Sequence, residues 1–217
     1  QSLMAISTIC LNVASGLYGD AAIAAMSVVS RVMTMANSAL IGFGQGFQPV
    51  CGFNYGAKLY DRVREGFRFC VKWGTLFLVV ASIVGYAFAP QLVAVFRDDP
   101  EVVAFGTVAM RCQCLTFPLA AYALVSNMMT QTMGKTVPAT ILAAARQGLF
   151  FIPAVLLMPL WLDQLGVQLA QSVADVLSFA LTLVMMRRVF RNLRSEENAA
   201  MLLRHHRTSD PYPAENV

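Results

Sequence analysis

Long uninterrupted apolar stretches dominate the chain, and the charged residues fall between them. No Asp, Glu, Lys or Arg occurs within residues 32–57, 73–96 or 112–134. Each stretch exceeds the roughly 20 residues that a helix needs to cross about 30 Å of hydrocarbon. The apolar runs are continuous rather than alternating, which favours helices over β-strands. We predict six membrane-spanning helices near residues 1–18, 22–50, 70–96, 102–133, 137–161 and 165–190.

Composition supports this interpretation. Of the 217 residues, 57% are hydrophobic and 13% are charged, whereas ordinary globular domains have about 45–50% apolar and about 25% charged residues. So few charges do not cover a water-exposed surface, and a net charge of +4 is too small and too scattered to mark a nucleic-acid partner. The prediction is an all-α membrane protein: a six-helix transmembrane bundle over residues 1–193, followed by a polar cytoplasmic tail over residues 194–217.

Basic residues lie on alternate connections between the predicted spans. The connection at residues 97–101 is net acidic, and the next outer turn carries Asp163. The positive-inside bias therefore places the basic connections and the C-terminus in the cytoplasm, with the bundle in the plasma membrane. The basic residues concerned are Lys58, Arg62, Arg64, Arg68, Lys72, Lys135, Arg187, Arg188, Arg191 and Arg194.

Residues 58–72 are amphipathic, because Leu59, Val63 and Phe67 recur at helical spacing among basic residues. We expect this segment to lie along the inner membrane interface before the third span. It either contacts anionic lipid or is a topology signal and anchor, and the second interpretation is preferred.

The two ends of the chain differ: the start shows no signal peptide, and the C-terminal tail is polar. The sequence opens with Gln1 and has neither a basic n-region nor a cleavage site, so we expect the start to be an internal point of a longer protein. The tail after Asn192 is expected to be mobile. Its adjacent His205 and His206 lack a partner cluster, so no metal site is expected there.

A glycine-rich segment, GFGQGFQPVCGFNYG at residues 42–56, ends the second span. Its glycines lie four apart in two pairs, a spacing that lets helix backbones approach closely. Pro49 frees a carbonyl one turn earlier, which Gln45 or Gln48 is expected to satisfy. Helix packing and hinging are preferred over ligand binding. The residues of this motif are Gly42, Gln45, Gly46, Gln48, Pro49, Gly52, Asn54 and Gly56.

Four charged residues lie well inside the predicted spans: Arg31, Arg111, Arg146 and Asp175. A charge at the bilayer centre costs about 2.5–3.5 kcal/mol on insertion scales, so each is expected to be paired or hydrated. Arg146 and Asp175 lie on consecutive antiparallel spans at similar depth, and we predict that they meet. Their contact is either a static ion pair that fixes helix register, the preferred interpretation, or a switch in which Asp175 takes up a proton.

Four motifs follow one another along the chain. The first is the segment at residues 42–58, followed by Arg62 and Val63. The others are QTMGK at 131–135, ARQ at 145–147 followed by FIP at 151–153, and the stretch from Gly166 to Asp175. In this order they resemble helices seven to twelve of a known family, the multidrug and toxic compound extrusion (MATE) transporters, in its MepA-like branch, over nearly all of residues 1–193.

The resemblance implies one of two six-helix lobes, with drug export driven by inward proton or sodium flow and no other cofactor. The missing N-terminal lobe is the implied partner, and many members place a coupling carboxylate there. One sodium-coupled branch carries acidic residues on helices seven and ten. Here the first span offers Asn12 and Ser15, and residues 102–133 offer Arg111, Gln113 and Asn127 but no carboxylate. That cation site is therefore not expected in this chain.

Polar residues within the spans are candidates for a substrate or ion pathway, although they serve equally well as cross-links between helices. Gln171 lies one turn before Asp175 on the same helix face, and Gln147 adjoins Arg146. The candidates are Asn12, Arg111, Asn127, Arg146, Gln147, Gln171 and Asp175. Deformable apolar residues suited to varied cations are Met26, Met33, Met35, Met110, Met128, Met129, Met133, Phe117, Phe150 and Phe151.

The favoured function is half of a secondary active multidrug exporter, which exchanges amphipathic organic cations for a coupling cation by alternating access. A lipid-linked oligosaccharide flippase of the same superfamily is an alternative, since an anionic substrate needs basic residues such as Arg31, Arg111 and Arg146 in one cavity. An inactive transporter fragment is another. An intramembrane enzyme is disfavoured because Asp175 is the sole acid within the spans and both histidines lie in the tail. The five cysteines lack a metal-type spacing and are expected to be small apolar residues.

Overall fold

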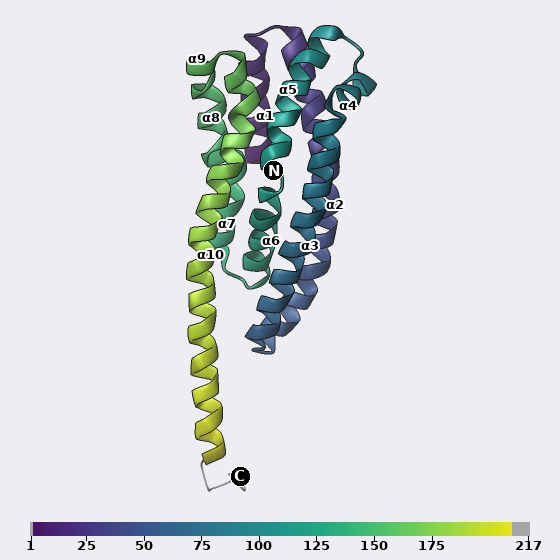
Figure 1. Ribbon diagram of the computed structural model, residues 1–217. Helices are drawn as coiled ribbons and strands as arrows, with labels where there is room; N and C mark the ends of the chain where they lie inside the picture. Colours follow the sequence, from purple (N-terminus) through teal and green to yellow (C-terminus); the bar gives the residue numbers. More distant parts are fainter. Residues whose placement is uncertain (1, 210–217) are drawn as a thin grey trace.

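Six antiparallel segments make up the bundle, and every element described is helical (Figure 1). The computed structural model describes the backbone of residues 2–209 and the side chains of residues 3–146 and 148–198. The elements are α1 (Ser2–Gly16), α2 (Asp20–Gly56), α3 (Tyr60–Ala87), α4 (Ala89–Phe96), α5 (Pro100–Thr116), α6 (Leu119–Thr132), α7 (Thr136–Ala144), η1 (Ala145–Leu149), α8 (Phe151–Leu157), α9 (Pro159–Leu162) and α10 (Gln164–Ser209).

The two ends of the bundle carry different connections. We call the end with residues 17–19, 97–99 and Asp163 the upper end, and the end with residues 57–59 and 133–135 the lower end (Figure 1). The predicted acidic connection therefore lies at the upper end, and the basic connections lie together at the lower end. This separation of charge between the two ends is the feature from which the topology was predicted, and the orientation in the membrane stays a prediction.

Three helices are long and apolar enough to cross a membrane by themselves: α2, α3 and the part of α10 up to Asn198. The pair α5 and α6 makes a fourth candidate span, bent by 58°. The remaining segments contain shorter apolar helices at residues 3–16 and 151–162. The chain is thus an all-helical membrane protein, and the six expected spans correspond to six segments of unequal length.

Prolines break two of the predicted continuous spans. Pro118 lies between α5 and α6, where the expected single span 102–133 bends. Pro90 lies in the first turn of α4, so the expected span 70–96 ends as α3 at Ala87 and restarts as a separate short helix. Proline lacks the backbone N–H that would continue the helical ladder, and its ring crowds the preceding turn. Hydropathy alone does not register either effect.

The predicted span 137–161 is divided further, into α7, η1, α8 and α9. At η1 the Phe150 N–H donates to the Ala145 carbonyl at 3.0 Å, a bond one residue longer than in an α-helix. Pro153 follows in the next turn and lacks a donor of its own. Such π-helical turns change which way the side chains point, and Arg146 lies on this one.

The amphipathic segment is not a separate helix on the membrane surface, which corrects the prediction for residues 58–72. Lys58 adopts a positive φ of 59° in the turn after α2, and α3 begins at Tyr60. Val63 and Phe67 are buried in a core cluster with Met186 and Leu193 of α10. The apolar stripe therefore packs against neighbouring helices of the protein rather than against lipid.

The glycine motif packs differently from its expected pairs. A side chain at Gly42, Gly46 or Gly56 would meet no atom within 4 Å, so these three glycines are not helix contacts within this chain. The close approaches occur at Gly44, which lies directly against the Met128 side chain, and at Gly52, whose hypothetical Cβ would lie 3.1 Å from Thr132 Cγ2. Both partners belong to α6.

Helix α2 continues through Pro49 to Gly56, beyond the predicted end at residue 50. The expected role of Gln45 or Gln48 in satisfying the local backbone is not observed, because neither side chain makes a hydrogen bond within the described part of the chain. The buried Asn54 side chain donates to the Val50 carbonyl at 2.8 Å. This is a different carbonyl from the one that Pro49 leaves free, which belongs to Gln45 one turn earlier.

Helix α10 continues without a break through Asn192 and residue 193 as far as Ser209. The expectation of a mobile tail after Asn192 is therefore wrong for the backbone up to Ser209.

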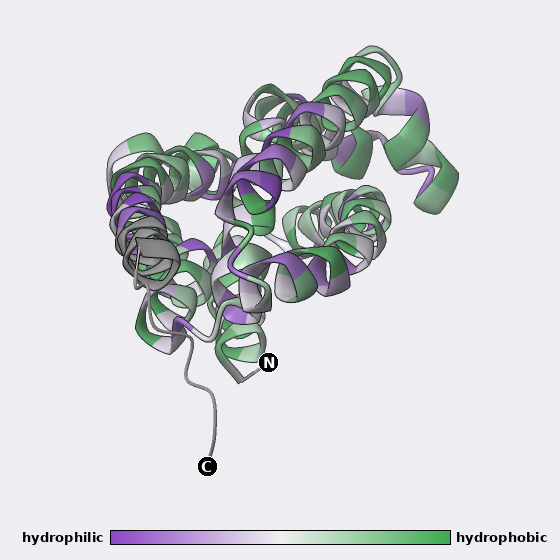
Figure 2. Ribbon diagram, turned by 90° about the horizontal axis from the view of Figure 1, so that it is seen from below, coloured by the Kyte–Doolittle hydropathy of each residue, from purple (hydrophilic) through white to green (hydrophobic). Residues whose placement is uncertain are grey.

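Three core clusters fill the bundle, one near each end and a smaller one between α2, α3 and α6. Many large apolar side chains remain exposed, including Leu17, Val95 and Trp161 at 77%, 82% and 89%. Apolar positions thus lie along the outside of the bundle (Figure 2), as a lipid-facing surface requires.

Candidate functional site

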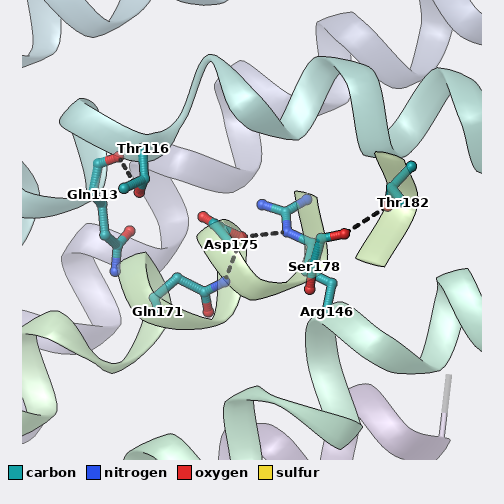
Figure 3. Close-up of polar contacts among 7 residues, drawn as sticks. All are labelled: Gln113, Thr116, Arg146, Gln171, Asp175, Ser178 and Thr182. Carbon is teal, nitrogen blue, oxygen red and sulfur yellow. Dashed lines mark hydrogen bonds and ion pairs between the residues drawn. The ribbon is translucent and has the colours of Figure 1, made fainter. Parts of the chain in front are cut away.

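An ion pair joins η1 to α10 in the middle of the bundle. Arg146 Nε donates to Asp175 Oδ1 at 2.8 Å, which confirms the predicted contact. Gln171 Nε2 donates to the same oxygen at 3.1 Å (Figure 3). Asp175 is only 5% exposed, while the Arg146 side chain is 21% exposed. A buried carboxylate with two donors on one oxygen is fixed in orientation, and the pair as a whole is neutral.

These three side chains line a cavity of about 280 Å³. Its walls come from α1, α2, the end of α5, η1, α8 and α10. The other polar side chains on the wall are Ser7, Thr8, Ser30, Thr34, Asn37 and Gln113. Residues far apart in the sequence therefore contribute to one polar chamber inside an otherwise apolar bundle.

Two amides extend the polar wall beyond what we predicted. The buried Oδ1 of Asn37, on α2, has no hydrogen-bond partner among the described residues. Gln113, on α5, is 6% exposed and lies on the side of Asp175 away from Arg146 (Figure 3). A buried acceptor without a partner is costly unless a ligand or water supplies a donor. Asn37 lies in an uncharged stretch, and only its polarity within an apolar run could have pointed to it.

Other predicted pathway residues lie away from this cavity. Asn12 is exposed on α1, and Asn127 on α6 accepts a hydrogen bond from Gln131 instead. Arg111 is exposed, and its guanidinium lies 5.3 Å from the Tyr86 ring centroid. Arg111, which was expected to be paired or hydrated, thus has no ion pair within the described residues and lies over an aromatic face. The side chain of Gln147 lies outside the described residues.

Arg31 also lies on the surface of this chain. Its side chain is exposed on α2 and has no ion-pair partner within the described residues. Of the three arginines well inside the predicted spans, only Arg146 lines the cavity. Depth counted from the span ends was therefore insufficient to identify which charges face inward.

The deformable apolar residues divide in the same way. Met26, Met33, Phe117 and Phe151 line the cavity, together with Met4, which we had not predicted. Met110 is buried in the upper core, whereas Met129 and Met133 belong to the lower core cluster. Met35 is 69% exposed, Met128 packs against Gly44, and Phe150 packs beside the upper core. Four of the ten predicted residues thus contribute to the chamber.

In the described part of the chain, no group of three or more metal-ligating side chains occurs, and all five cysteines are free. Cys51, Cys70 and Cys114 are buried among apolar residues, as expected of small core residues. The side chains of His205 and His206 lie outside the described residues.

An ion pair beside a polar chamber, enclosed by membrane-spanning helices, is characteristic of membrane transport proteins, in which buried charges mark substrate or ion pathways. The MatE family model matches residues 1–157, and the chain belongs to this family of transporters, which are not enzymes. Two multidrug export proteins named MepA are among its relatives. The one from Staphylococcus saprophyticus is 22% identical over 156 residues, covering 72% of this chain and 34% of its own length.

The second MepA relative, from Staphylococcus aureus strain RF122, is 23% identical over 175 residues, covering 81% of this chain and 38% of the relative. The chain thus spans about a third of the length of the curated relatives it matches. Two solved structures have the same fold. The Vibrio cholerae MATE transporter VcmN in the bent form has a TM-score of 0.81 at 21% identity, with 89% of this chain and 43% of that chain covered.

A MOP superfamily transporter from Pyrococcus furiosus has a TM-score of 0.84 at 16% identity, with 89% of this chain and 44% of that chain covered. At such identities the likeness concerns the fold alone. The described helices therefore match somewhat less than half of a complete transporter of this family, which is consistent with one lobe.

Proposed function

We propose that this chain is the C-terminal lobe of a multidrug exporter that exchanges amphipathic organic cations for protons or sodium ions across the plasma membrane. The chamber around Asp175 forms part of the substrate pathway. The length of the chain relative to MepA and the fold of the chain support one lobe. The names of the relatives of the chain support drug export. The partner in this proposal is the N-terminal six-helix lobe of the same protein, and the coupling cation binds there.

The observation that carries the proposal is the composition of the chamber wall. Most of its apolar part is deformable or aromatic, and Leu11 and Ile41 complete it; the deformable and aromatic residues are Met4, Met26, Met33, Phe117 and Phe151. Its polar part offers acceptors, the unpartnered Asn37 Oδ1 among them. Methionine adapts to ligands of different shape, and aromatic faces attract organic cations. Such a wall suits amphipathic cations of varied structure better than a single defined metabolite.

In this proposal the Arg146–Asp175 pair fixes the position of η1 relative to α10 and does not itself carry protons. Each partner already has a defined hydrogen bond, and Gln171 further holds the carboxylate. Alternating access then comes from this lobe rocking against its partner lobe around a site near the bilayer midplane. The lower end, with its basic connections, faces the cytoplasm.

A flippase for anionic lipid-linked oligosaccharides finds less support. That function needs several basic residues on one cavity wall, whereas Arg31 and Arg111 are exposed and only Arg146 lines the chamber. Asp175 neutralises that single arginine. An inactive fragment remains the alternative if the full-length protein exports no dye.

The substrate pathway is tested by dye efflux from cells that carry the full-length protein. Asn37→Leu removes the free acceptor from the wall and should lower dye efflux about two- to tenfold, because one hydrogen bond contributes about 0.5–1.5 kcal/mol. Asn12→Leu is the matched control, since Asn12 is exposed and lies off the chamber. Equal effects of the two substitutions at equal expression would contradict the proposed pathway.

The static role of the ion pair is tested separately with Asp175→Asn. Dye efflux is compared with and without a proton gradient at matched protein levels. If the pair only fixes helix position, efflux in the variant should still respond to the gradient. Normal expression together with loss of proton-dependent efflux would instead identify Asp175 as the proton switch.

A further inference from the structure

A second cleft, of about 720 Å³, lies at the lower end between α3 and α10. It is separate from the chamber around Asp175, because the two share no lining residue. Four of the side chains on its wall are arginines, and one is a carboxylate, Glu197. The lining residues are Arg64, Phe67, Arg68, Phe190, Arg191, Arg194, Glu197 and Asn198.

Among the described residues, only Arg64 of the four arginines has an ion-pair partner. Arg64 donates to Glu197 Oε2 at 2.7 Å and to Asp61 Oδ1 at 2.9 Å. Arg68, Arg191 and Arg194 make no ion pair with any described residue. Three free guanidinium groups from two helices thus converge on one concave surface. Like charges held close together repel one another, so an anion bound between them would be stabilised by all three.

The floor of the cleft is aromatic and rigid. Phe67 is 4% exposed, and its ring meets the Phe190 ring edge-on at a centroid distance of 5.2 Å. This contact fixes α3 against α10 at the level of the arginines. The position of the cleft is therefore set by the packing of α3 against α10. The arginines lie on these two packed helices and not on a loop.

The cleft lies at the depth where lipid headgroups are expected. On α3, Arg68 precedes the half-exposed Trp73 by five residues, about 7.5 Å along the helix. Above Trp73, exposed apolar residues such as Phe77 and Val80 follow. Tryptophan favours the boundary between hydrocarbon and headgroups. The arginines thus lie just outside this boundary, and the apolar helix surface above them is available to acyl chains.

We propose that this cleft binds the phosphate-bearing headgroup of an anionic phospholipid from the adjoining leaflet. The phosphodiester accepts hydrogen bonds from Arg68, Arg191 and Arg194, whose planar guanidinium groups match its oxygens. Glu197 keeps Arg64 at the rim through its ion pair. Basic pockets between membrane helices favour such headgroups over zwitterionic ones. Bound lipid would therefore link α3 to α10 at this end of the lobe.

The test is native mass spectrometry of the purified full-length protein, titrated with phosphatidylglycerol or with phosphatidylcholine. The double variant Arg68→Gln/Arg191→Gln removes two free guanidinium groups from the cleft. The control variant Arg62→Gln/Arg188→Gln removes the same charge from exposed positions on the same two helices that do not line it. Each arginine is expected to contribute about fivefold to the affinity for an anionic headgroup. We therefore expect about 25-fold weaker phosphatidylglycerol binding in the first variant and little change in the control.

Three results would overturn the proposal. Equal loss in both double variants would show general attraction to the basic end. Equal affinity of the unmodified protein for phosphatidylglycerol and phosphatidylcholine would show that the headgroup charge is not recognised. Displacement of phosphatidylglycerol by millimolar inorganic phosphate, with phosphate retained on the protein, would identify a soluble anion as the ligand. Thermal denaturation of both double variants establishes that they are folded. All four substituted arginines are exposed, so their replacement by glutamine leaves the core packing unchanged.

Discussion

Arg146 Nε lies 2.8 Å from Asp175 Oδ1, and the two residues are 29 positions apart in the chain. The arginine comes from the π-helical turn η1, and the aspartate comes from the uninterrupted helix α10. The turn thus presents its one charged side chain to the buried carboxylate of the neighbouring helix. The ion pair thus holds the π-helical turn η1 against helix α10 beside the proposed substrate chamber.

The first prediction concerns the energy of this pair. Arg146→Gln and Asp175→Asn should each destabilise the full-length protein, and the double variant should be less destabilised than the sum. A coupling energy of about 1–3 kcal/mol is expected for neighbouring charged groups, below the largest values for buried pairs because Arg146 is partly exposed. Denaturation of the four proteins in detergent measures it. Additive effects would mean that the pair contributes no stability of its own.

The second prediction separates two glycines of one motif. Gly44→Leu should destabilise the protein by about 1–3 kcal/mol, because the new side chain meets Met128. Gly46→Leu, on the same helix, should change stability by less than about 0.5 kcal/mol, since nothing lies within 4 Å of its position. Thermal denaturation compares the two. Adding Met128→Ala should restore part of the loss in Gly44→Leu, and failure to do so would argue against this contact.

The third prediction concerns the first turn of α10, where it packs against the backbone at Met158 and Pro159. A Cβ on Gly166 would overlap the backbone of Met158 and Pro159, which unlike a side chain has no rotamer to move away. Gly166→Ala should therefore cost about 2 kcal/mol or more in stability and lower the yield of folded protein. Gly42→Ala is the control, because that position is open. Equal melting temperatures for the two variants would show that this turn is not closely packed.

The fourth prediction concerns how α10 is held at the lower end. Glu197 pairs with Arg64 at 2.7 Å, and Glu196 pairs with Lys135 at 3.6 Å. Glu197→Gln should raise amide exchange in α10 beyond residue 187 by up to about fivefold, because such pairs contribute about 0.2–1 kcal/mol. High salt should reduce the difference. Glu65→Gln is the control, because Glu65 is exposed and makes no ion pair with any described residue. The same increase there would remove Glu197 as the cause.

The candidate site was predictable only where distance along the chain determined it. Arg146 and Asp175 lie at matching depths on consecutive helices, and they do meet. Depth does not determine rotation about the helix axis, so Arg111 and Asn12 were expected near the pathway but lie on exposed faces. Asn37 was not singled out, and Gln113 was noted but not counted among the pathway candidates, because a neutral amide in an apolar run is only a weak signal. Whether the side chains of Asn37 and Gln113 point into the chamber depends on how α2 and α5 pack around it.

The sequence by itself determined a membrane-embedded, all-helical bundle with charge separated between its ends, because a bilayer accepts only long apolar helices and few charges. It also determined that Asp175 needed a partner. The tertiary structure decided where those helices break, which glycines lie in contact and which arginines face inward. Prolines, the π-helical turn at Arg146 and helix rotation set these features, and each depends on how neighbouring helices pack rather than on hydropathy along the chain.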